Sequence, residues 1–116
     1  MRLGCHAVLF REKIKTDTEN IIKGLSETGF EGSEIGSRFF GTEEKGLLLQ
    51  ILKKYNYQMS GMHVGVPLKD WANKEKREEQ KKNVLKVAEF VQDMPNKNVI
   101  MSGSDLEDGF DLKIIA

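Results

Sequence analysis

The 116-residue chain has a single cysteine, only two prolines and no excess of either charge. Cys5 cannot form an internal disulfide, which is typical of proteins from a reducing compartment such as the cytoplasm. Lys and Arg total 18, as do Asp and Glu, so the basic excess needed to bind nucleic acid or an anionic membrane is missing. No apolar run reaches the roughly 18 residues of a membrane span, and the N-terminus lacks the apolar stretch of a signal peptide.

The residues that are present suit one soluble globular domain, with 39% apolar and 31% charged side chains. Short runs of apolar and small residues predict four strands. These are Arg2–Ala7, Glu31–Ile35, Gln58–Val64 and Asn98–Ser102. Amphipathic stretches between them predict helices from about residues 17 to 28, 42 to 55 and 74 to 94. The order β-α-β-α-β-α-β indicates an α/β fold with a parallel sheet and right-handed crossovers.

The predicted helices carry their own end signals. Gly29 is expected to end the first helix and Asn56 the second, because both residue types readily adopt the left-handed conformation of a helix C-terminus. Pro95 ends the third, since proline cannot continue a helix. Asp17 or Thr18 is the expected N-cap of the first. The mixed charge run KEKREEQKK opens the third helix and is expected to be a solvated face.

The two faces of the predicted sheet differ, because side chains alternate along a strand. One face is aliphatic, and Cys5 falls on it as an inert thiol. The other carries glycines and one polar residue near the end of each strand, namely His6, Glu34, His63 and Ser102. Alternation also puts Met59 on this second face, beside Gly61 and His63. A doubly wound sheet would be aliphatic on both faces, so the pattern favours the interior of a (β/α)8 barrel, whose polar residues gather at the carboxyl ends of the strands.

A complete (β/α)8 barrel needs about 250 residues. This sequence predicts three βα units, a fourth strand and the start of a helix near Asp111. We therefore expect residues 1–116 to form one partial TIM-barrel domain, about the first half of the barrel.

Four segments resemble the sugar phosphate isomerase/epimerase family, whose members are xylose isomerase-like TIM barrels. They are RLGCHAVLF at the N-terminus, ETGFEGSEIG (Glu27–Gly36), SGMHVG (Ser60–Gly65) and NKNVIMSG (Asn96–Gly103). The resemblance implies a sugar or sugar-phosphate substrate, a divalent metal (Mn, Mg or Zn) and proton transfer next to a carbonyl. By the resemblance, Glu34 and His63 occupy catalytic positions and His6 a substrate-contacting one.

The sequence departs from this family in two ways. The main metal ligands of the family come from strands five to eight, which this chain lacks, so we expect incomplete metal binding and little or no activity from the chain alone. The endonuclease-like members of the superfamily place a histidine at the end of the fourth strand, where this chain has Ser102 and Gly103. That difference, like the balanced charge, speaks against a nuclease.

Each candidate residue also has a purely structural interpretation. Glu34 could pair with a cation such as Arg38, and His63 or His6 could simply be hydrogen-bonded within the sheet. Trp71 could be a wall for a sugar or a cap over the core. Arg38 follows the second strand and is expected at the mouth of the barrel, as a substrate contact. The two histidines and Glu34 could converge on a metal, although no short spacing motif supports this.

Open strand edges and an exposed inner face favour self-pairing. We therefore expect a homodimer, a complementing C-terminal half or marginal stability. Two other functions remain open from the sequence. One is a non-catalytic fragment with a binding or assembly role. The other is a small flavodoxin-like domain, which would need helices on both faces of the sheet.

Overall fold

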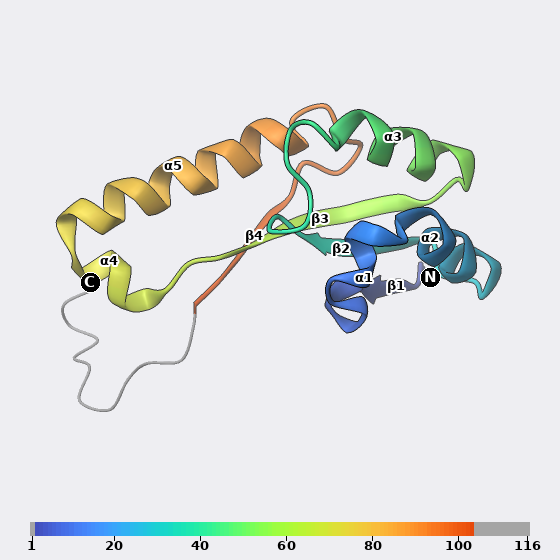
Figure 1. Ribbon diagram of the computed structural model, residues 1–116, viewed down its shortest axis with the longest axis horizontal. Helices are drawn as coiled ribbons and strands as arrows, with labels where there is room; N and C mark the ends of the chain where they lie inside the picture. Colours follow the sequence, from blue (N-terminus) through green and yellow to red (C-terminus); the bar gives the residue numbers. More distant parts are fainter. Residues whose placement is uncertain (1, 104–116) are drawn as a thin grey trace.

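The computed structural model describes residues 2–103, which form an α/β fold around a four-stranded parallel sheet (Figure 1). The strands are β1 (Gly4–His6), β2 (Gly32–Gly36), β3 (Gln58–Gly65) and β4 (Val99–Ser102). Their order in the sheet is the order in the chain, β1-β2-β3-β4, and every pair is parallel. All four predicted strands are therefore confirmed. The helix expected near Asp111 lies outside the described residues.

Five α-helices and one 3₁₀ helix connect the strands. They are η1 (Ala7–Phe10), α1 (Lys13–Thr16), α2 (Thr18–Glu27), α3 (Lys45–Lys54), α4 (Leu68–Ala72) and α5 (Lys74–Val91). The three predicted helices correspond to α2, α3 and α5. The sequence did not predict η1, α1 and α4, because elements of one turn are too short to show a helical period. No helix in residues 2–103 has both the length and the apolarity needed to cross a membrane.

Helices α2 and α3 end as predicted, at a residue in the left-handed conformation. Gly29 has φ 92° and Asn56 has φ 48°. In both cases the next backbone N–H reaches back to a helix carbonyl, from Phe30 to Leu25 at 3.0 Å and from Tyr57 to Leu52 at 2.8 Å. These bonds satisfy carbonyls that would otherwise lack a partner at the end of each helix. Asp17 is the N-cap of α2, but its side chain bonds Asn20 Nδ2 instead of a backbone N–H.

One face of the sheet is buried under the helices. Buried aliphatic and aromatic residues from α2, α3 and α5 form a single core with the strands. In Figure 1, α3 and α5 lie along the same side of β3, the longest strand. At the centre of this core, Ile35 of β2 pairs in register with Met62 of β3, and both side chains are fully buried. The core therefore occupies the aliphatic face predicted from the sequence.

A β-bulge in β3 changes which residues face this core. Ser33 pairs with Met59, whereas the next residue, Glu34, pairs with Gly61, so Ser60 is an extra residue. Met59 therefore faces the core and is 1% exposed. The prediction that Met59 shares a face with Gly61 and His63 was wrong, because strict alternation fails across a bulge.

The opposite face of the sheet is the one rich in glycine. Its only fully buried members within the described strands are Gly32 and Gly61. A Cβ on Gly32 would lie 2.6 Å from the Gln58 carbonyl oxygen, and one on Gly61 would lie 2.8 Å from Ile100 Cδ1, so close packing within the sheet explains both glycines. A flavodoxin-like sheet reverses its strand order at a switch point, but the described sheet has no such reversal. The polar side chains Glu34 and His63 follow Gly32 and Gly61 along their strands, nearer the carboxyl ends.

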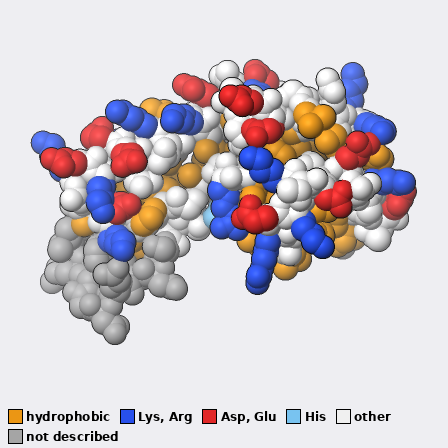
Figure 2. Space-filling model, viewed as in Figure 1, with side chains coloured by type: hydrophobic (Ala, Val, Ile, Leu, Met, Phe, Trp, Pro, Cys, Tyr) orange, Lys and Arg blue, Asp and Glu red, His pale blue; other side chains and the backbone are white. Residues whose placement is uncertain are grey.

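Charged side chains of both signs are interspersed over the surface, as Figure 2 shows for one side of the molecule. The run from Lys74 to Lys82 is mostly exposed on α5, as predicted for a solvated face. Asn73 caps this helix by accepting hydrogen bonds from the N–H groups of Glu75 and Lys76.

Candidate active site at the strand ends

Four polar side chains meet on the glycine-rich face, near the carboxyl ends of the strands. In register, His6 lies beside Glu34, Gly36 beside His63, and Gly65 beside Ser102. Partners in register point to the same side of a sheet, so the polar residues of all four strands face the same side. The row expected from the sequence is therefore present.

The side chains of His6 and Glu34 lie in contact across β1 and β2. His6 Nε2 lies 3.3 Å from Glu34 Oε1. The other ring nitrogen, Nδ1, accepts a hydrogen bond from the Val8 N–H at 3.3 Å. Because a backbone N–H can only donate, Nδ1 carries no proton, and the proton of the neutral ring sits on Nε2, the atom that faces the carboxylate. This arrangement orients Glu34 and answers one question left by the sequence, since its partner is His6 and not Arg38.

His63 and Ser102 form a second pair across β3 and β4. Their Nε2 and Oγ atoms are 2.5 Å apart, and either can donate, depending on the tautomer of the ring. The rings of His63 and His6 approach edge to face, with centroids 6.1 Å apart. The two pairs are thus neighbours, and together they offer a carboxylate, two imidazoles and a hydroxyl.

A cavity of about 140 Å³ opens between the two histidines and the loop after β2. Its walls include His6, His63, Gly36, Arg38 and Phe39. A Cβ on Gly36 would lie 3.2 Å from the Phe39 ring, so glycine lets that ring pack close to the strand. The Arg38 guanidinium carbon lies 4.5 Å from the centre of the same ring, a cation–π contact. The cavity has room for a small polar group but not for a large ligand.

The structure brings together four of the five residues selected from the sequence. His6, His63 and Arg38 line the cavity, and Glu34 Oε1 lies 3.3 Å from His6 Nε2. Trp71 lies apart, in α4, where it packs half-buried against the core and is not a lining residue of this cavity. Its backbone carbonyl accepts a hydrogen bond from Arg77 Nε at 2.7 Å. Trp71 therefore packs against the core and does not join the cavity between the histidines.

Ser102 joins the site although it was not selected as a site residue. A serine in a strand has many structural roles, so its type gives no functional signal. The available signal was its position, since it is the polar residue that ends the fourth strand. Its contact with His63 depends on the register of β3 and β4, which the sequence does not specify.

The described residues do not by themselves form a metal site. Within residues 2–103, no three His, Cys, Asp or Glu side chains are grouped so that they could hold an ion. The Nε2 atom of His6 faces Glu34 and that of His63 faces Ser102. Cys5 lies on the core side of β1, in register with Ser33, and is half-buried there. It is not part of the site.

Comparison of the sequence with protein-family models, with curated proteins and with solved structures found no match. The functional argument therefore depends on the geometry of these residues.

Proposed function

We propose that the sheet is the first part of a (β/α)8 barrel and that the site belongs to a cytoplasmic isomerase or epimerase of sugars or sugar phosphates. The observation that carries the proposal is the row of polar side chains at the carboxyl ends of four consecutive parallel strands, on the face away from the core. TIM-barrel enzymes place their active sites at this end of the strands. Sequential strand order and helices packed on one face also fit the first half of such a barrel.

Glu34 is the proposed general base. The side chain is 22% exposed, so it can reach a ligand while His6 holds it in place. The carboxylate takes the proton from the carbon next to a sugar carbonyl, and the electron pair left behind forms an enediolate. The hydroxyl proton of the enediolate then moves to the former carbonyl oxygen, and return of the first proton to the former carbonyl carbon leaves the new carbonyl on the neighbouring carbon. A fixed base of this kind contributes roughly 10²–10⁴-fold to such a reaction.

The other residues bind and orient the substrate. His63 and Ser102 present a ring nitrogen and a hydroxyl, which suit the hydroxyl and carbonyl oxygens of a sugar. Arg38 sits at the rim of the cavity, where its guanidinium suits a phosphate group. The family that the sequence resembles uses a divalent metal from later strands, and a complementing C-terminal half or a second copy of the chain would have to supply such ligands.

The proposal can be tested in two experiments with D-fructose 6-phosphate and Mg²⁺. Binding is followed in H₂O by ¹H–¹⁵N NMR of the protein, and deuterium incorporation into the sugar is followed separately in D₂O. We expect the amide signals of Gly36 and Gly65 to shift, and His63→Ala to weaken binding. Glu34→Gln keeps the shape of the side chain but removes the base, so binding should persist while deuterium incorporation into the sugar is lost. Lys23→Gln on α2 is the control.

The outcomes separate the competing functions. Absence of shifts at the strand ends would contradict a sugar site. Deuterium incorporation that depends on Glu34 would favour the isomerase. Binding without incorporation is expected both of an incomplete barrel that lacks its metal ligands and of a non-catalytic binding module.

A further inference from the structure

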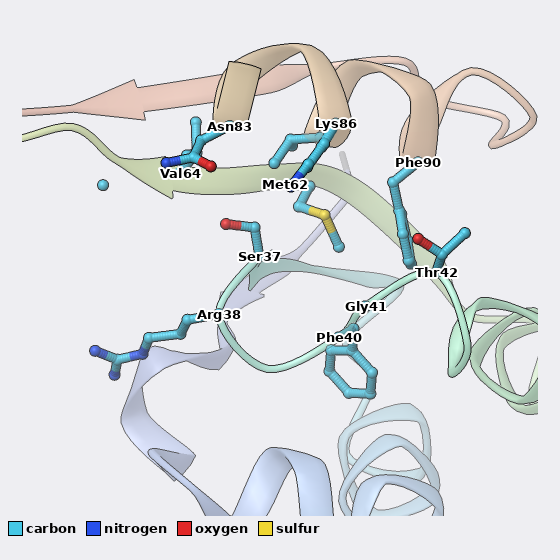
Figure 3. A pocket seen from close by; sticks show the side chains of 12 residues that line it. Ser37, Arg38, Phe40, Gly41, Thr42, Met62, Val64, Asn83, Lys86 and Phe90 are labelled. Carbon is cyan, nitrogen blue, oxygen red and sulfur yellow. The ribbon is translucent and has the colours of Figure 1, made fainter. Parts of the chain in front are cut away.

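A second, larger cavity of about 430 Å³ lies between the loop after β2, strand β3 and helix α5 (Figure 3). Its floor includes Met62 and Val64, which point to the helix-covered side of the sheet, away from His63. The two cavities share part of the loop after β2, but α5 lines only the larger one. The proposed isomerase chemistry does not use this space.

The floor and back wall of this cavity are apolar. Met62 and Val64 come from β3, Phe40 from the loop after β2, and Val87 and Phe90 from α5. These five side chains are at most 7% exposed, so they are fixed by the core. A cavity of this size with apolar walls is typical of a site for a small organic molecule. The apolar floor predicts a ligand with an apolar body, such as a ring.

The polar residues of the cavity indicate which charge its ligand should carry. Asn83 and Lys86 are three residues apart on α5 and therefore share one face of that helix. In Figure 3, Asn83 faces Ser37 across the cavity, and Lys86 reaches from α5 toward the floor. Arg38 and Thr42 complete the polar lining, and none of the twelve lining residues is acidic.

Neither cation of this lining is neutralised within the described part of the chain. Lys86 and Arg38 form no ion pair with any residue in 2–103, whereas Lys45, near the same helix, is paired with Asp93 at 2.8 Å. Glu89, one turn along α5 from Lys86, does not line this cavity, although it lines an adjoining depression that Lys86 also lines. Positive charge without a carboxylate favours an anionic ligand.

We propose that this cavity binds a small organic phosphate, with its apolar body on Met62 and Val64 and its phosphate held by Lys86, Asn83 and Ser37. An ammonium group and neutral donors are a common set for a phosphate, since the cation supplies charge and the neutral groups fix the orientation. The site differs from the proposed sugar site, because His6, Glu34 and His63 do not line it, but the two cavities adjoin and share Ser37, Arg38 and Gly65.

Phenyl phosphate is a suitable probe, since it has one ring and one phosphate. It should shift the amide signals of Gly41, Asn83 and Val87, which line only this cavity, saturably in ¹H–¹⁵N spectra of the 116-residue chain. Benzyl alcohol lacks the charge and inorganic phosphate lacks the ring, so each should bind at least about tenfold more weakly.

Variants locate the site. Lys86→Gln should weaken phenyl phosphate binding about tenfold, as expected when a charged hydrogen bond is lost. Asn83→Asp, which puts a carboxylate into the cavity at nearly unchanged shape, should weaken it further. Lys82→Gln removes the same charge from an exposed position on the same helix and should leave the affinity unchanged, as should Glu34→Gln.

Three results would overturn the proposal. They are the absence of saturable shifts at these amides, equal weakening by Lys86→Gln and Lys82→Gln, and binding of inorganic phosphate as tight as that of phenyl phosphate. The first would mean that the cavity binds no such anion, the second that only overall charge matters, and the third that the apolar floor contributes nothing. The spectra of the free variants also report whether each one is folded.

Discussion

His6 holds the Glu34 carboxylate from the neighbouring strand, with Nε2 3.3 Å from Oε1, while its own Nδ1 accepts the Val8 N–H. Each ring nitrogen of His6 therefore has a partner. Since Nδ1 accepts a hydrogen bond, the proton of the neutral ring is on Nε2. The short helix η1 contributes to this geometry, because Val8 is its second residue and His6 is its N-cap. Helix η1, which the sequence did not predict, thus orients the ring of His6, which the sequence did predict as a site residue.

The tautomer of His6 gives the first prediction. At pH 8, where an ordinary imidazole is neutral, long-range ¹H–¹⁵N correlation spectra should show His6 protonated at Nε2 and bare at Nδ1. Glu34→Gln keeps an oxygen acceptor and should preserve this tautomer, whereas Glu34→Leu should allow a mixture. A dominant Nδ1–H form in the unmodified protein would contradict the geometry.

Two glycines give a matched pair of stability predictions. Gly24 lies inside α2, and a Cβ there would have no atom within 4 Å, so Gly24→Ala should stabilise the protein by about 0.5–1 kcal/mol. Gly32→Ala should destabilise it by about 2 kcal/mol or more, because its Cβ would lie 2.6 Å from the Gln58 carbonyl oxygen. Urea unfolding of the two variants measures both values. Equal effects of the two substitutions would refute the packing argument.

Tyr57 gives a prediction about pH. The side chain is 3% exposed, and burial raises the pKa of its hydroxyl above the usual 10.0, against the opposing effect of the hydrogen bond to Ser33 Oγ. Above pH 10 the unfolded chain loses this proton before the native protein does, so the free energy of unfolding should fall as pH rises further. Below pH 10 the contribution is fully present.

The measurement compares urea unfolding at pH 9 and pH 10.5. Tyr57→Phe should show a smaller loss of stability over this range than the unmodified protein. Tyr55→Phe is the comparison, because it removes the chain's other tyrosine hydroxyl, which lies at the surface beside Glu19, and Tyr57→Phe should reduce the loss by more than Tyr55→Phe does. The same loss in all three proteins would show that other groups cause the pH dependence.

The parts of the fold that could be predicted depend on local signals. Apolar runs located the four strands. Gly29 and Asn56 end α2 and α3 as expected, because the left-handed backbone conformation at the end of a helix favours glycine and asparagine in any surroundings. The polar row at the strand ends was predictable for the same reason, since alternation along a strand is a property of the backbone.

The parts that could not be predicted depend on contacts between segments far apart in the chain. Met59 was placed on the wrong face because the bulge at Ser60 is set by pairing with β2. Trp71 was expected either as a wall for a sugar or as a cap over the core, and the structure shows it in α4, packed against the core and outside the cavity between the histidines. The His63–Ser102 bond joins residues 39 apart in the sequence. Contacts of this kind join distant segments, so the local sequence pattern around either residue does not predict them.

The bulge itself gives the last prediction, because two asparagines hold it from the segment before β4. Asn96 Nδ2 donates to the Met59 carbonyl at 3.1 Å, and Asn98 Nδ2 donates to the Ser60 carbonyl at 2.9 Å. Asn96 is half-buried and Asn98 is exposed. Replacing either by Asp removes the donor and sets a carboxylate against a carbonyl oxygen.

Asn96→Asp should therefore destabilise the protein by about 1–2 kcal/mol and Asn98→Asp by less, since water can replace the bond at the exposed site. Hydrogen exchange of the Met62 amide, which donates to the Asn98 carbonyl at 2.9 Å, reports the bulge locally. It should become faster in Asn96→Asp than in Lys97→Gln, a matched control at the exposed position between the two. If exchange is unchanged while global stability falls, the asparagine stabilises the fold without holding the bulge, and the orientation of Gly61 and His63 toward the site must have another cause.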